Sequence, residues 1–149
     1  MKNAKKPRPI RVVTVTRKRD LPPESGRMPC ADVTAHTIFV TRKTPKSVVE
    51  HERYHILKRH PRKPRDPVEY VRQEFEAMLY SYKKTGHPRH ILHRLYGLTN
   101  EINHGLYRYG WRDTYRIISA AMSKLDVPRG WLEDKKKWHG KMAKLGWKD

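Results

Sequence analysis

Two histidines and a glutamate have the spacing that can hold and use a metal ion. His51, Glu52 and His55 form an H-E-x-x-H string inside the segment VVEHERYHILKRH. On a helix, residues four apart lie one above the other, so both imidazoles can face one ion. Glu52 lies about 100° round the helix, where it can act as general base on a water held by that ion. The string therefore predicts a zinc site with His51 and His55 as ligands and Glu52 as the catalytic residue.

The motif needs a helical context, because shuffling a chain of this composition produces the string in about 3% of cases. That context is present. Thr44-Pro45 offers a cap followed by proline at the first helical position, and Ser47-x-x-Glu50 offers a capping box. His60-Pro61 ends the helix near Arg59. By helical angle His60 lies nearly opposite His51, so it is not counted as a ligand.

A catalytic zinc site needs a third protein ligand and one open position. The next expected helix carries Glu74-Phe75-Glu76-Ala77, and a turn with an antiparallel return would bring it back to the histidines. Glu74 lies closer to the apolar stripe of that helix than Glu76 does. The alternative is a pair of solvated surface glutamates. His104, in N-H-G-L, is a further candidate ligand.

A strand, an H-E-x-x-H helix and a second helix with E-x-E-A resemble the gluzincin metallopeptidases over roughly residues 33–82. The pattern is most similar to the small repressor-cleaving and radiation-response type found in bacteria and mobile elements. The resemblance implies hydrolysis of peptide bonds at a Zn ion. It implies His51, His55 and Glu76 as metal ligands, with Glu52 as the base. The chain departs from the family at Tyr54, where a small residue is usual. The His-Gly at His104 resembles the Spartan-type proteases that digest DNA-bound proteins.

The charge of the chain favours a polyanionic partner. With 34 Lys and Arg against 15 Asp and Glu, the formal net charge is +19, which indicates DNA or RNA, an anionic surface or an acidic protein. The candidate nucleic-acid contacts are Arg62, Lys63, Arg65, Lys83, Lys84, Arg89, Lys135, Lys136 and Lys137. Bases could stack on the interleaved aromatic residues Tyr107, Tyr109, Trp111 and Trp138. Trp111 and Trp131 are nevertheless expected in the core, because each begins a helix beside apolar residues.

The patterning predicts an α+β fold, in which a small N-terminal antiparallel sheet precedes a mostly helical body with the H-E-x-x-H helix. Residues 1–9 are expected to form a flexible basic arm, and residues 10–149 a single domain. Strands at 10–17 and 32–42 could pair as a hairpin with a long connection. The expected helices cover about 44–59, 66–85, 88–96, 99–109, 111–124 and 128–145.

Cysteine content and hydropathy narrow the class further. Cys30 is the only cysteine, which excludes a disulfide framework and a cysteine-based metal cluster. The sequence has no membrane-length apolar run and no apolar leader, so we expect no membrane partner. We expect a cytoplasmic location, for a protein encoded by a cell, a virus or a mobile element.

The sequence supports two alternative functions. One is a zinc-dependent metallopeptidase acting on a protein or peptide near nucleic acid. The other is a basic nucleic-acid-binding or virion-associated protein with a non-catalytic metallopeptidase-like fold.

Overall fold

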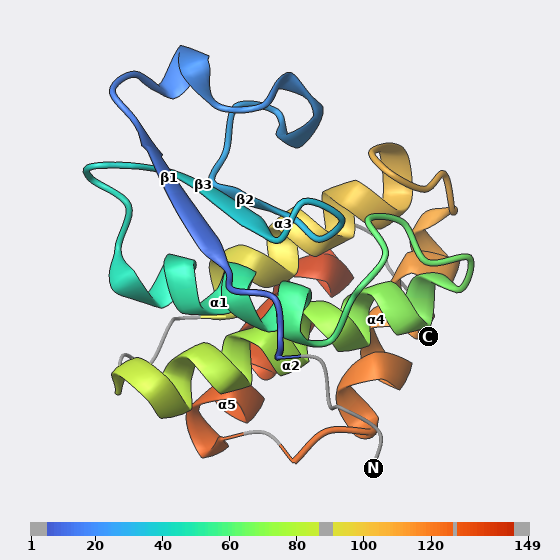
Figure 1. Ribbon diagram of the computed structural model, residues 1–149. Coiled ribbons are helices and arrows are strands. Elements are labelled where there is room, and N and C mark those ends of the chain that lie inside the picture. The colour runs from blue at the N-terminus through green and yellow to red at the C-terminus, as the bar shows by residue number, and fades with distance from the viewer. Residues whose placement is uncertain (1–5, 87–90, 127, 145–149) are drawn as a thin grey trace, which may run out of the picture. The chain divides into compact units, whose positions relative to one another are not determined.

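The protein has an α+β fold, with a small sheet near the N-terminus followed by a mostly helical body (Figure 1). The computed structural model describes residues 6–86, 91–126 and 128–144. The strands in these ranges are β1 (Arg11–Val15), β2 (Cys30–Asp32) and β3 (Thr37–Thr41). The helices are α1 (Lys46–Leu57), α2 (Pro67–Thr85), α3 (Ile91–His104), α4 (Trp111–Ser123) and α5 (Arg129–Lys144). The expected fold class is confirmed.

The chain divides into two compact units, and the boundary between them runs through α2. The first unit contains the described residues up to Pro61 together with Tyr80–Gly86. The second contains Arg62–Leu79 and the described residues after Gly86. The expectation of a single domain over 10–149 stays a prediction. So does the flexible arm over 1–9, of which residues 1–5 lie outside the described ranges. None of the described helices is both long and apolar enough to cross a bilayer.

The sheet of the first unit is mixed, so the expectation of a purely antiparallel sheet is wrong. Its strand order is β1-β3-β2, with β1 parallel and β2 antiparallel to β3. The connection between β1 and β3 is long enough for the crossover that parallel pairing requires. The antiparallel partner is β2, which joins β3 through a turn over residues 33–36. In that turn the Ala35 amide donates to Asp32 Oδ1 at 2.8 Å and His36 has a φ of +52°.

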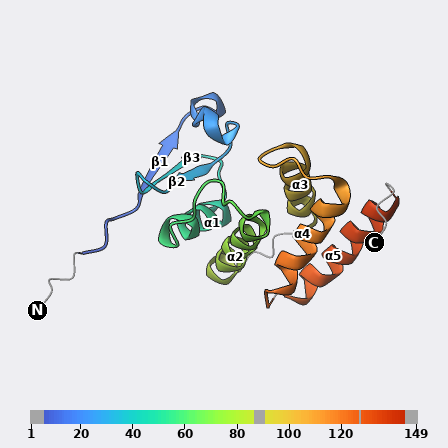
Figure 2. The same cartoon turned by 90° about the vertical axis from the view of Figure 1, so that its right-hand side faces the viewer.

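The core of the first unit lies between the sheet and α1. Ile38 and Val40 on β3 are 0% and 4% exposed, and Ile56 on α1 is 2% exposed. These three side chains form one apolar cluster, with Val49 of α1 packed at its edge. Because residues two apart on a strand share a face, β3 presents Ile38 and Val40 to α1, which runs along the sheet (Figure 2). The sheet therefore fixes the helix that carries the H-E-x-x-H string.

The second unit has a helical core in which α3 packs against α4 and α5. One helix covers 91–104, where two short helices over 88–96 and 99–109 were expected. That expectation is wrong because Leu95, Leu98 and Ile102 form one stripe of fully buried residues across Gly97. Thr99 does not start a new helix, since its hydroxyl donates back to the Leu95 carbonyl at 2.7 Å.

The tryptophans in the described part of the second unit include both buried and exposed side chains. Trp131 is 3% exposed, as expected for a core residue, and Trp138 is 0% exposed. The Trp138 indole donates to Thr99 Oγ1 at 3.1 Å, so its ring belongs to the core and is not accessible to bases. Trp111 is 47% exposed, which shows that its assignment to the core was wrong. It begins α4 on the solvent side, beside a loop.

Helix ends follow local signals at α2 more closely than at α1. Asp66 Oδ1 accepts from the Val68 amide at 2.9 Å, and α2 ends before Gly86, which has a φ of +68°. At α1 the N-cap is Pro45, with no side-chain cap bond. Thr44 was expected to cap this helix. Its hydroxyl instead accepts from the Thr41 amide at 2.9 Å, which closes the turn after β3.

Candidate metal centre

The helix α1 ends in a Schellman motif, which returns the chain towards the histidines. The Arg59 and His60 amides donate to the carbonyls of Ile56 at 3.1 Å and His55 at 2.9 Å. Arg59 takes the left-handed position, with a φ of +52°. This is the pairing that defines the motif. The reversal places His60 beside His55, although an extended helix would carry it to the opposite face.

Three imidazoles of the first unit stand in a row. His55 Nε2 lies 3.1 Å from His51 Nε2, and His55 Nδ1 lies 2.9 Å from His60 Nδ1. Two nitrogens bound to one tetrahedral zinc ion at about 2 Å are about 3.3 Å apart, so the His51–His55 spacing fits a shared ion. His51 and His60 are 6% and 9% exposed, and His55 between them is half-buried.

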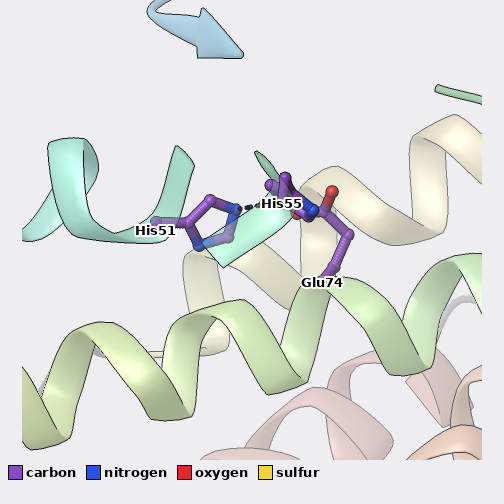
Figure 3. Close-up of side chains that lie close together, drawn as sticks. All are labelled: His51, His55 and Glu74. Carbon is purple, nitrogen blue, oxygen red and sulfur yellow. Dashed lines mark hydrogen bonds between the residues drawn. The ribbon is translucent and has the colours of Figure 1, made fainter. Parts of the chain in front are cut away.

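A carboxylate completes the metal-binding group. His51, His55 and Glu74 each offer one ligand atom, and these atoms all lie within 4.8 Å of one another (Figure 3). Glu74 is on α2, the continuous helix that belongs to both units, and is 8% exposed. Two imidazoles and one carboxylate are a donor set typical of zinc and other divalent transition metals. This buried group could therefore hold a metal ion.

The other candidates from the sequence have different positions. Glu76, the ligand implied by the gluzincin resemblance, forms an ion pair with Arg72 one turn earlier on α2. His104 is exposed at the end of α3, where its Nδ1 lies 2.9 Å from Asn103 Oδ1. Among the described residues, the metal-capable group contains Glu74 and neither of these. Glu52 is half-buried on α1, directly after the first histidine.

Arg72 holds two carboxylates of α2 along the surface of the helix. It pairs with Glu69 as well as with Glu76. The hydrogen bond to Glu69 and the charge of Glu76 raise the pKa of Arg72 above its ordinary value, against the lowering effect of burial. Glu76 therefore has a cation as its neighbour.

A polar network inside the second unit fixes Glu74. Arg94 Nη2 lies 2.9 Å from Glu74 Oε2, and Arg94 Nη1 lies 3.5 Å from Glu101 Oε1. The Tyr70 hydroxyl donates to the other oxygen of Glu101. Burial alone would lower the pKa of Arg94, but the charges of Glu74 and Glu101 outweigh it and raise that pKa. Burial, then the same two carboxylates, raise the pKa of Tyr70 well above its usual range, so its hydroxyl remains a donor.

Two of the basic residues singled out in the sequence lie over tyrosine rings. Lys63 Nζ lies 5.2 Å from the centre of the Tyr107 ring, and Lys84 Nζ lies 5.6 Å from that of Tyr80. Most of the others are exposed: Arg62, Arg65, Lys83, Lys136 and Lys137, with Lys135 half-buried. Arg89 lies outside the described residues. The segment at 62–65 contacts Tyr107, which directly precedes the basic segment at 108–112.

Comparison with protein-family models, with curated proteins and with solved structures gives no match. The interpretation of the site therefore depends on its geometry. Sequence reasoning missed two residues of this geometry, His60 and Arg94. His60-Pro61 already signalled the end of the helix. A reversal of the chain at that point could have suggested that His60 lies beside His55. For Arg94, twenty residues after Glu74, the sequence holds no local signal.

Proposed function

We propose that this protein is a zinc-dependent peptidase whose metal is held by His51, His55 and Glu74. The observation that carries the proposal is the buried group of two imidazoles and one carboxylate within 4.8 Å. Catalytic zinc sites keep three protein ligands and one open position, and this group supplies three. Glu74 takes the role that the gluzincin resemblance implied for Glu76. A zinc ion has no redox chemistry of its own, which suits hydrolysis.

Held by His51, His55 and Glu74, a zinc ion would supply Lewis acidity and would lower the pKa of a bound water towards neutral. Glu52 is the general base, since its carboxylate follows the first ligand in the H-E-x-x-H string. With the ion bound, the Glu52 carboxylate would be the group that accepts and returns a proton during hydrolysis. The substrate is a protein or peptide.

Metal analysis of purified variants tests the ligand set. The wild type should carry about one zinc per chain, and His51→Ala and Glu74→Gln should lose it. Glu76→Gln is the matched control, because it removes the same charge from the same helix two residues away. It should retain the metal. Equal, negligible zinc content in the wild type and in His51→Ala would refute the proposal. Loss of zinc in Glu76→Gln but not in Glu74→Gln would identify Glu76 as the third ligand.

Hydrolysis separates the base from the ligands. Glu52→Gln should keep the zinc content of the wild type and lose cleavage of an unstructured protein such as casein. The change removes the proton acceptor and keeps the shape of the side chain. Cleavage by Glu52→Gln at the wild-type rate would remove Glu52 from the mechanism.

The second candidate function is a nucleic-acid-binding protein with a non-catalytic site. The net charge of +19 favours it, because neutralising phosphates releases counterions and gives steeply salt-dependent binding. Such binding without zinc and without proteolysis would select it over the peptidase. The two functions are compatible if the substrate is a protein bound to nucleic acid.

A further inference from the structure

Two basic segments that are far apart in the sequence meet in the second unit. One is the Arg-Lys-Pro-Arg segment at 62–65, and the other is Arg-Tyr-Gly-Trp-Arg at 108–112. They are joined through Tyr107, whose hydroxyl donates to the Pro64 carbonyl and whose ring lies 5.2 Å from Lys63 Nζ. Tyr107 is 7% exposed, so it connects the segments and offers little surface itself. We call residues 62–65 and 108–112 together the Tyr107 surface.

The Tyr107 surface exposes large aromatic side chains between arginines. Trp111 is 47% exposed and Tyr109 is 39% exposed. Arg108 and Arg112, on either side of them in the sequence, are exposed as well. By contrast, Phe75, Trp131 and Trp138 of this unit are buried, at 0%, 3% and 0% exposed. Exposed aromatic residues interleaved with cations are the composition that single-stranded nucleic acid recognises.

The loop that carries these rings is held in place by the end of α3. The amides of Gly105, Tyr107 and Tyr109 donate to the carbonyls of Asn100, Glu101 and Ile102 at 2.9 to 3.0 Å. The Asn103 side chain donates to the Tyr109 carbonyl at 2.7 Å. A Cβ at Gly105 would lie 2.9 Å from Glu101 Cα, so the close approach needs glycine. Because the backbone is already ordered, a ligand does not have to order it on binding.

We propose that the Tyr107 surface binds single-stranded DNA or RNA. Bases stack on Trp111 and Tyr109, and phosphates contact Arg108, Arg112 and the 62–65 segment. A single strand fits better than a duplex, because a duplex hides the faces of its bases while a single strand offers them to aromatic rings. An acidic protein would use the cations but has no need of flat exposed rings. The inference goes beyond the proposed peptidase, since none of these residues is a metal ligand or the base.

Fluorescence anisotropy with a labelled oligothymidylate of about 12 nucleotides tests the stacking. Trp111→Ala and Tyr109→Ala should each weaken binding about 5- to 150-fold, and Trp111→Phe should stay near the wild type because it keeps a ring. Leu132→Ala is the matched control, since Leu132 is also 47% exposed in this unit. It should bind as the wild type does. Circular dichroism checks that each variant is folded.

Salt dependence separates stacking from charge. Trp111→Ala should leave the slope of log K against log salt unchanged, while Arg108→Gln and Arg112→Gln should each reduce its magnitude by about 0.7. His51→Ala should bind the oligonucleotide as the wild type does, so loss of the peptidase proposal would not affect this one. Equal affinity of Trp111→Ala and Leu132→Ala would overturn the proposal. So would tighter binding of a matched duplex, or of phosphatidylglycerol vesicles, than of the single strand.

Discussion

Replacing His60 by phenylalanine tests whether a residue outside the ligand set positions the metal centre. His60 Nδ1 lies 2.9 Å from His55 Nδ1, on the side of the ring away from the nitrogen that faces His51. Such an outer partner fixes the tautomer and orientation of a ligating histidine, and its removal lowers metal affinity about 10- to 100-fold. We therefore expect His60→Phe to bind zinc about 1.4 to 2.7 kcal/mol more weakly.

Phenylalanine is chosen because it keeps the ring and removes the nitrogen. The His60 ring makes an edge contact with Tyr54, with ring centroids 5.5 Å apart, and phenylalanine can retain it. Zinc affinity is measured by competition with a chromophoric chelator at pH 7. Thermal unfolding of the metal-free proteins gives the purely structural effect, expected at about 1 kcal/mol for one hydrogen bond.

Tyr54→Phe is the control, since it keeps the ring contact with His60 and removes only a hydroxyl. It should bind zinc as the wild type does. A zinc affinity of His60→Phe equal to that of the wild type would refute the positioning role. An equal loss in Tyr54→Phe would show that packing around His55, and not the nitrogen of His60, supports the site.

Three further changes test the fold. Arg59→Gly should raise the free energy of unfolding in urea by about 1 kcal/mol, because glycine adopts the φ of +52° without steric cost. An unchanged urea midpoint of unfolding would show that Arg59 is not strained in this conformation. Gly105→Ala should cost about 1–3 kcal/mol through its contact with Glu101, whereas Gly130→Ala, with no neighbour within 4 Å, should not destabilise. The pKa of Tyr70 is raised in the folded protein, so folded Tyr70 keeps its proton above about pH 10, where the unfolded chain releases it. The stability that Tyr70 contributes is therefore complete below about pH 10 and is lost progressively as the pH rises above it. Tyr70→Phe should lack this alkaline loss in denaturant titrations from pH 8 to 11; identical pH dependence would count against the raised pKa.

Local sequence signals were enough to predict the bounds of α2. The continuity of α3 and the pairing of β1 with β3 depend on tertiary contacts. The start of α2 at Asp66-Pro67 and its end before Gly86 depend on capping within a few residues, so the sequence predicted them. The continuity of α3 through Gly97 depends on burial of Leu95 and Leu98, which outweighs the cost of one glycine in a helix. Parallel pairing of β1 with β3 depends on partners that no local pattern specifies.

The part of the candidate site that lies on one helix could be predicted from helical geometry. The four-residue spacing placed His51 and His55 on one face, and the structure brings their Nε2 atoms 3.1 Å apart. Glu74 and Glu76 differ by about 200° round their helix, so only one could face the histidines. The apolar stripe favoured Glu74, and the family resemblance favoured Glu76. His60 was missed because its helical angle was extended beyond the point where α1 ends.

The contacts of Arg94 bear on which ions the site would accept. A glutamate side chain that is held by a ligand loses rotational freedom, which costs about 1–2 kcal/mol. Glu74 has lost this freedom already, because Arg94 Nη2 holds one of its oxygens at 2.9 Å and the side chain is buried. Calcium takes six to eight oxygen ligands in flexible geometry, and a carboxylate that cannot move is poorly suited to join such a shell. Stiffness would then discriminate against large, hard ions in a way that the choice of ligand atoms alone does not.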